Sequence, residues 1–242
     1  HALRPFFTGG GITRATKWLL NHSEHYLGFD CKDPPRDLIR PFYMSLNFAH
    51  PEVRAKRLEI IEEMCRRYEI DGVELNFMRH PHYFKTDEVD KGLGLMTDLM
   101  RQARAVTEKI GERDGRAISL SAFRVPAHIG GCLKIGLDVP TWTKEGLVDI
   151  VVPESYQYAE PGLQMRKFVE VAEGTRCQVL AQLSGPPEVF RAMAYNYWRI
   201  GVGGFRLHTR TPANNLNPST RELVDPEVMA RRDKRYVVRG PR

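Results

Sequence analysis

Strands and helices alternate along most of this chain, and that alternation limits its fold more than any other feature. Neighbouring strand patterns begin about 25 to 50 residues apart, the length of a βαβ unit with its loops. Such alternation predicts a parallel sheet, which right-handed crossovers build into either a barrel or a doubly wound sheet. We expect strands at 70–77, 117–123, 148–153, 177–183 and 203–208, and helices at 51–68, 88–111, 140–145, 163–173 and 187–199.

Polar residues recur on one face of these strands, and this favours the barrel. Glu74 and Asn76 have the same parity in the first strand, and alternate side chains of a strand point to the same face. Three other strands carry polar pairs of one parity: Ser119 and Ser121, Gln182 and Ser184, and Arg206 and His208. A barrel interior that opens to a site at one end accounts for this pattern. No Gly-x-Gly-x-x-Gly turn follows a strand, so the sequence does not support a dinucleotide-binding sheet.

The number of strands indicates that the barrel is incomplete. A closed (β/α)8 TIM barrel needs eight strands, and residues 1–50 add only one weak strand, at 42–48. The missing strands should therefore be N-terminal. We expect residues 1–50 to form an irregular loop region of the barrel, 51–210 to hold the βα units, and 211–242 to form a C-terminal loop and basic tail.

Charge and hydropathy restrict the partners of the chain. The formal net charge is +6, but the basic residues are scattered and the densest run, at 231–235, accompanies no nucleic-acid-binding module. We therefore expect no nucleic-acid partner. No stretch approaches 18 consecutive apolar residues, so we expect no membrane span.

Neither cysteines nor histidines follow a known metal-binding pattern. The four cysteines are far apart and form no Cys-x-x-Cys pair. His22, His25, His80 and His82 raise the question of a metal site, but His80 and His82 are separated by Pro81 and lack the i, i+4 spacing of a helical zinc pair. We therefore expect no metal and no other cofactor.

Chemically active side chains gather at the carboxyl ends of the strands, where barrel enzymes place their catalytic groups. A carboxylate inside a barrel is costly unless it is paired or hydrogen-bonded. Glu74 is therefore either a catalytic or substrate-orienting carboxylate or the ion-pair partner of Arg79 or Arg206. Glu154 is either an exposed loop acid or the second of the two carboxylates that a glycosidase needs, one as acid and one as base or nucleophile. The substrate-binding candidates around the two glutamates are Asn76, Arg79, His80, Arg124, Tyr156, Gln182 and His208.

Residues 71–79, Asp-Gly-Val-Glu-Leu-Asn-Phe-Met-Arg, resemble the Asp-Gly-Ile-Glu-Leu-Asp-Phe-Met-Arg strand of the glycosyl-hydrolase-like ten group. These are bacterial TIM-barrel proteins often labelled family 10 glycosylhydrolase. Segments 46–54, 136–149 and 233–236 are similar to that group in the same order. The resemblance implies a TIM barrel whose strands four to eight lie in this chain. It also implies a carbohydrate substrate and a secreted or periplasmic protein, although the chain shows no signal segment.

One departure from that group concerns the chemistry. The group has Asp where this chain has Asn76, and an amide cannot act as an anionic nucleophile or base. We predict a glycoside-hydrolase-like protein that hydrolyses a polysaccharide or oligosaccharide, with Glu74 and Glu154 as the catalytic carboxylates. Two alternatives remain open: a catalytically inactive carbohydrate-binding barrel, which Asn76 favours, and a barrel enzyme that holds a phosphorylated metabolite at Gly203 and Gly204.

Overall fold

A computed structural model describes most of the chain, which folds as two units. The described residues are 6–8, 11–14, 17–28, 45–78, 82–154, 164–183, 187–207 and 222–235. The first unit consists of His1–Val73, Arg79–Ile118 and Cys132–Val139, and the second consists of Glu74–Met78, Ser119–Gly131 and Pro140–Arg242.

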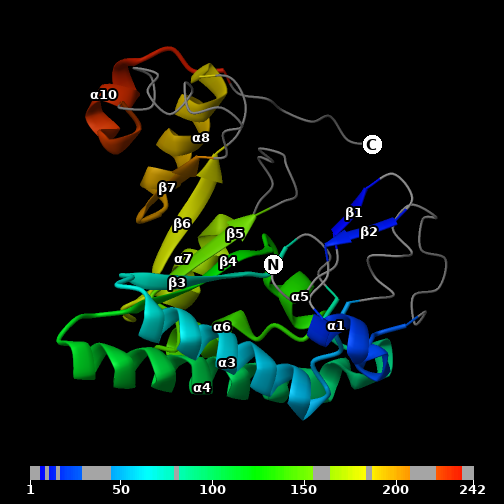
Figure 1. The fold of residues 1–242 in the computed structure, drawn as a ribbon. Helices are drawn as coiled ribbons and strands as arrows, with labels where there is room; N and C mark the ends of the chain where they lie inside the picture. Colours follow the sequence, from blue (N-terminus) through cyan, green and yellow to red (C-terminus); the bar gives the residue numbers. More distant parts are fainter. Residues whose placement is uncertain are drawn as a thin grey trace. The chain divides into compact units, whose positions relative to one another are not determined.

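Two long helices of the first unit, α3 (Pro51–Arg67) and α4 (Val89–Asp114), pack side by side (Figure 1). Both confirm helices expected from the sequence. α3 begins with proline at its first position, where the missing N–H costs nothing, and it ends on two arginines that complement the helix dipole. α4 ends at Gly115, whose left-handed conformation is the usual way to close a helix.

The amino-terminal part of the first unit differs from the sequence expectation. It contains a hairpin of β1 (Phe6–Thr8) and β2 (Gly11–Arg14), the short helix α1 (Lys17–Asn21) and the 3-10 turn η1 (Ser23–His25). The weak strand expected at 42–48 is wrong over its described residues, because Leu46 makes only an isolated bridge to Tyr26. The division of the chain at residues 50 and 210 stays a prediction.

The buried ring of Phe84 packs where two glycines of the first unit leave room for it. A Cβ atom on either Gly92 or Gly136 would lie 2.6 Å from a ring carbon, which is too close for any real contact. Gly136 also has a φ of 83°, in the left-handed region that disfavours every side chain. Phe84 therefore requires glycine at these two positions.

Replacing Gly136 with alanine should lower the free energy of unfolding by about 2–4 kcal/mol, which combines the left-handed backbone with overpacking. Gly115→Ala is the matched control, since Gly115 has a φ of 65° but no described atom within 4 Å of its Cβ position. That variant should lose only about 1–2 kcal/mol. Urea unfolding of both proteins measures the difference, and equal losses would show that the Phe84 contact carries no energy.

The second unit is built on a five-stranded sheet whose strands follow the order of the chain (Figure 1). Parallel pairing joins Ser121 to Ile150, Ile150 to Gln178, and Leu180 to Gly204. A doubly wound sheet would reverse its strand order at a switch point, whereas the wall of a barrel runs in sequence, as here. The strands are β3 (Gly72–Asn76), β4 (Ser119–Pro126), β5 (Ile150–Glu154), β6 (Gln178–Leu183) and β7 (Gly204–Leu207).

All five strands and the remaining helices expected from the sequence are confirmed. The expected helices are α6 (Val139–Lys144), α7 (Met165–Ala172) and α8 (Pro187–Arg199). The structure adds two short helices, α5 (Ile129–Leu133) and α10 (Pro226–Arg231), the second within the expected C-terminal loop. Asp225 caps α10 by accepting hydrogen bonds from the N–H groups of Glu227 and Val228.

The sheet curls so that its two outer strands face each other. In a flat sheet, β3 and β7 would be about 19 Å apart, and their side chains would stand nearly parallel. Arg206 Nη2 of β7 nevertheless lies 3.3 Å from Glu74 Oε1 of β3. The sheet must therefore curve toward the face that carries both residues, as the wall of a barrel does. The α/β architecture is thus that of a partial, TIM-barrel-like fold.

The three described cysteines are buried and form no disulfide with one another. They are Cys65, Cys132 and Cys177. Burial raises the pKa of Cys132 to about 12, so this thiol stays protonated at neutral pH and is a poor metal ligand and nucleophile. Among the described helices, none has the length and apolar character that crossing a membrane requires.

Candidate functional site

β4 carries an irregularity at Arg124, near its carboxyl end. Phe123 pairs with Val152 and Val125 pairs with Pro153, so Arg124 is the extra residue of a β-bulge. Its φ of 58° makes it the one non-glycine residue with a left-handed backbone among the described positions. That conformation costs about 1–2 kcal/mol. A bulge redirects a side chain, and backbone strain of this kind collects at functional sites.

The bulge places the Arg124 guanidinium on the carboxylate of Glu154, the last residue of β5. Arg124 Nε donates to Glu154 Oε2 and Nη2 donates to Oε1, both at 2.7 Å. The Glu154 side chain is 2% exposed and the Arg124 side chain 15% exposed. Two charges so far from water are stable only with geometry of this quality, because desolvation opposes their attraction. Glu154 is therefore a buried, paired anion and not an exposed loop acid.

A second arginine lies over the Phe123 ring next to this pair. The Cζ atom of Arg206 is 3.5 Å from the ring centroid and that of Arg124 is 5.6 Å from it. Stacking of a guanidinium on an aromatic face is a favourable cation–π contact. Because Arg206 also contacts Glu74, a continuous series of contacts runs from Glu74 through Arg206, Phe123 and Arg124 to Glu154.

The pairing of Glu74 with Arg206 was one of the two possibilities that the sequence left open. The pair is accessible to water, since its side chains are 44% and 36% exposed, and the contact uses one carboxylate oxygen. An exposed ion pair of this kind contributes about 0–1 kcal/mol. The pair therefore explains where Glu74 lies, but it leaves the carboxylate within reach of a solute.

Gln182 of β6 lies opposite Arg206 in the sheet register. Gln182 is 8% exposed, and its side-chain Oε1 accepts no hydrogen bond within the part of the chain that the structure describes. A buried acceptor without a donor is costly and uncommon in native proteins. An O–H or N–H group of a ligand would satisfy this oxygen.

Asn76 has a local structural role at the end of β3. Its side-chain Oδ1 accepts a hydrogen bond at 2.9 Å from the N–H of Met78, which is the two-residue contact of an Asx turn. Aspartate would make the same contact. The turn at the end of the strand therefore does not require an acidic residue at this position. Asn76 can replace the Asp of the glycosyl-hydrolase-like ten group without changing the turn.

The other predicted binding residues lie outside the described part of the chain. The structure brings together Glu74, Arg124 and Glu154 through the contacts above, and it places Asn76 and Gln182 in the same sheet. Sequence reasoning missed Phe123, although this residue has the parity of Ser121 and directly precedes Arg124. The predicted residues beyond description are Arg79, His80, Tyr156 and His208.

The two glycines suggested for phosphate binding, Gly203 and Gly204, take part in the pairing of the sheet with β6. The Gly203 N–H donates to the carbonyl of Val179 at 2.9 Å, and Gly204 pairs with Leu180. Both residues stand at the amino end of β7, whereas barrel enzymes bind ligands at the carboxyl ends of their strands. This geometry does not favour the phosphorylated-metabolite alternative.

The described residues define an α/β protein with a partial, TIM-barrel-like fold. No protein-family model matches the chain, and no curated protein matches it either. Among solved structures, it is similar to the PgaB (BpsB) glycoside hydrolase domain from Bordetella bronchiseptica. The TM-score is 0.53 with 13% sequence identity, and the match covers 84% of this chain and 69% of that one. At this identity the similarity shows the fold alone.

Proposed function

We propose that this chain hydrolyses glycosidic bonds in a polysaccharide or oligosaccharide, as a relative of the glycosyl-hydrolase-like ten group. The observation that supports this best is the series of contacts that joins Glu74 to Glu154 on one curled sheet. Glycosidases use two carboxylates on either side of the scissile bond. The similarity in fold to a glycoside hydrolase domain agrees with this proposal.

The two carboxylates have different environments, which suggests different roles. Arg124 binds both oxygens of Glu154, so Glu154 would remain an anion and stabilise the positive charge of an oxocarbenium-like transition state. Glu74 is exposed and has one oxygen on Arg206, so it would transfer the proton. Arginine and amide side chains around them would bind sugar hydroxyls or an acidic substituent.

The other predicted residues would contact the substrate. Gln182 would accept a hydrogen bond from a sugar through its buried oxygen. We assign substrate contacts also to Asn76, Arg79, His80, Arg124, Tyr156 and His208. A polysaccharide substrate is met outside the cytoplasm, so we also propose a secreted or periplasmic protein.

A carbohydrate-binding barrel without catalysis is the second candidate function. The observation that favours it is the burial of Glu154, whose two oxygens are already occupied. In that case Glu154 would only position Arg124, and the site would bind sugars without cleaving them. Binding and cleavage therefore need separate assays.

The proposed hydrolysis predicts that the protein releases new reducing ends from at least one polysaccharide in a panel of neutral, acidic and amino polysaccharides. Affinity electrophoresis on the same panel measures binding. Glu59→Gln, a change in an exposed glutamate of α3 that pairs with Lys56, should cleave at the rate of the wild type. Binding without reducing ends would support the carbohydrate-binding barrel, and neither binding nor cleavage would contradict both candidates.

A further inference from the structure

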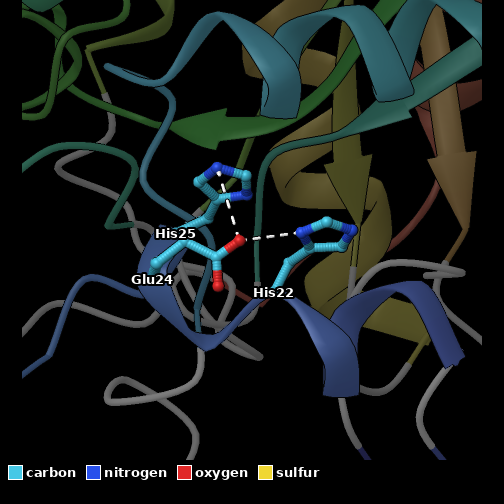
Figure 2. Close-up of side chains that lie close together, drawn as sticks. All are labelled: His22, Glu24 and His25. Atoms are coloured by element: carbon cyan, nitrogen blue, oxygen red, sulfur yellow. Dashed lines mark hydrogen bonds and ion pairs between the residues drawn. The ribbon is translucent and has the colours of Figure 1, made fainter.

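A second group of polar side chains, His22, Glu24 and His25, belongs to the first unit. One potential ligand atom from each residue lies within 4.8 Å of the others. Figure 2 shows a Glu24 oxygen between a ring nitrogen of His22 and one of His25. None of these residues takes part in the site on the sheet.

The local backbone explains why the two histidines align. His22 directly precedes the 3-10 turn η1, and His25 ends it. Side chains at i and i+3 eclipse in a 3-10 turn, so the two rings stack with centroids 5.4 Å apart and planes 12° apart. Backbone bonds fix this turn, since the N–H of Asn47 donates to the His25 carbonyl at 2.8 Å.

The spacing of the ligand atoms is close to what a zinc-class ion needs. Glu24 Oε1 lies 2.8 Å from His22 Nδ1 and 4.0 Å from His25 Nε2. Zinc bonds to nitrogen and oxygen of 2.0–2.2 Å place tetrahedral ligand atoms about 3.4 Å apart. The two observed distances bracket this value. The longer one is beyond hydrogen-bond range, so no direct bond holds His25 against Glu24.

His25 supplies a second observation through its Nε2. The residue is 8% exposed. Its Nε2 faces two carboxylates, Glu24 at 4.0 Å and Glu52 at 3.8 Å. A buried imidazole next to two carboxylates, with neither within bonding distance, is the arrangement that a cation would complete.

We propose that His22 Nδ1, the Glu24 carboxylate and His25 Nε2 bind one divalent transition-metal ion of the zinc class. Two imidazoles and one carboxylate form a ligand set that suits zinc, cobalt or nickel better than magnesium or calcium. Three protein ligands leave a fourth position for solvent or for Glu52. The sequence raised His22 and His25 as possible ligands but predicted no metal, because it does not show the 3-10 turn that aligns the two rings.

A second set of potential ligands competes for the same imidazole. His25, His50 and Glu52 also offer atoms within 4.8 Å of one another. We assign the ion to the first set because its carboxylate oxygen already lies against one imidazole nitrogen and faces the other. Substitutions in the two sets separate these assignments.

The test is a titration of the chelator-treated full chain with Co²⁺, followed by displacement with Zn²⁺. We expect visible d–d bands of tetrahedral cobalt that saturate at one ion per chain and disappear when zinc is added. His22→Ala and Glu24→Gln, which change side chains at the surface, should each weaken zinc affinity at least 10-fold, since even outer-shell changes cost 10–100-fold. His128→Ala, which removes an exposed histidine outside the cluster, should bind like the wild type.

Circular dichroism and the Tm of each variant establish that it is folded before its affinity is compared. Absence of cobalt bands in the wild type would overturn the proposal. So would variants His22→Ala and Glu24→Gln that bind zinc as tightly as His128→Ala. Loss of binding in His50→Ala and Glu52→Gln alone would also overturn it and assign the ion to the other set.

Discussion

Replacing Arg124 with methionine should lower the free energy of unfolding by about 3–5 kcal/mol, the usual cost of removing one partner from a buried ion pair. The substitution leaves the Glu154 carboxylate, which is 2% exposed, without either of its two guanidinium hydrogen bonds. Urea unfolding of the variant and the wild type measures the loss. Lys56→Met is the matched control, because it breaks an exposed pair with Glu59 at 2.8 Å and should cost about 0–1 kcal/mol.

A glycine at the same position separates the ion pair from the backbone strain. Arg124→Gly also leaves Glu154 unpaired, but glycine adopts the φ of 58° without penalty. It should therefore be about 1–2 kcal/mol more stable than Arg124→Met. The double variant Arg124→Gly with Glu154→Gln removes the unpaired charge as well and should recover part of the lost stability. An Arg124→Met variant as stable as the Lys56→Met control would show that the buried pair contributes no net stability.

The elements of the fold follow from local sequence pattern, and that is why they could be predicted. Strand-forming residues between turn signals mark β5 and β6, and helical spacing of apolar residues marks α3. The curl of the sheet was not predictable in this way. It is seen in the contact between Glu74 and Arg206, which are far apart in sequence and belong to the outer strands. No local pattern specifies such a contact.

The candidate site shows the same division between local and long-range information. Candidate residues could be proposed because alternation in a strand fixes which side chains share a face. The partner of Glu154 could not be predicted, since the bulge at Arg124 depends on how β4 and β5 pair. The histidine cluster was missed for a related reason. The three-residue spacing of His22 and His25 does not match the i, i+4 zinc pattern, and no local sequence signal marks the 3-10 turn that aligns the two rings.

Replacing Glu74 with glutamine should lower kcat on a cleaved polysaccharide by about 10²–10⁴-fold, the usual contribution of general acid–base catalysis. Glutamine keeps the size of the side chain and one oxygen for Arg206, but it cannot transfer a proton. Since the Glu74–Arg206 pair is exposed, stability should change by less than about 1 kcal/mol. Glu69→Gln is the matched control, because Glu69 is an exposed glutamate just before β3 and should leave kcat unchanged.

Glu154→Gln should lower kcat to a similar extent if Glu154 stabilises the transition state as an anion. If Glu154 only positions Arg124, the same variant should lose stability and raise KM while kcat falls little, because uniform binding is then what is removed. Reducing-end assays over a range of substrate concentrations separate kcat from KM, and the Tm of each variant shows that it is folded. A Glu74→Gln variant with the kcat of the Glu69→Gln control would show that Glu74 serves only as the ion-pair partner of Arg206, and the catalytic assignment would be wrong.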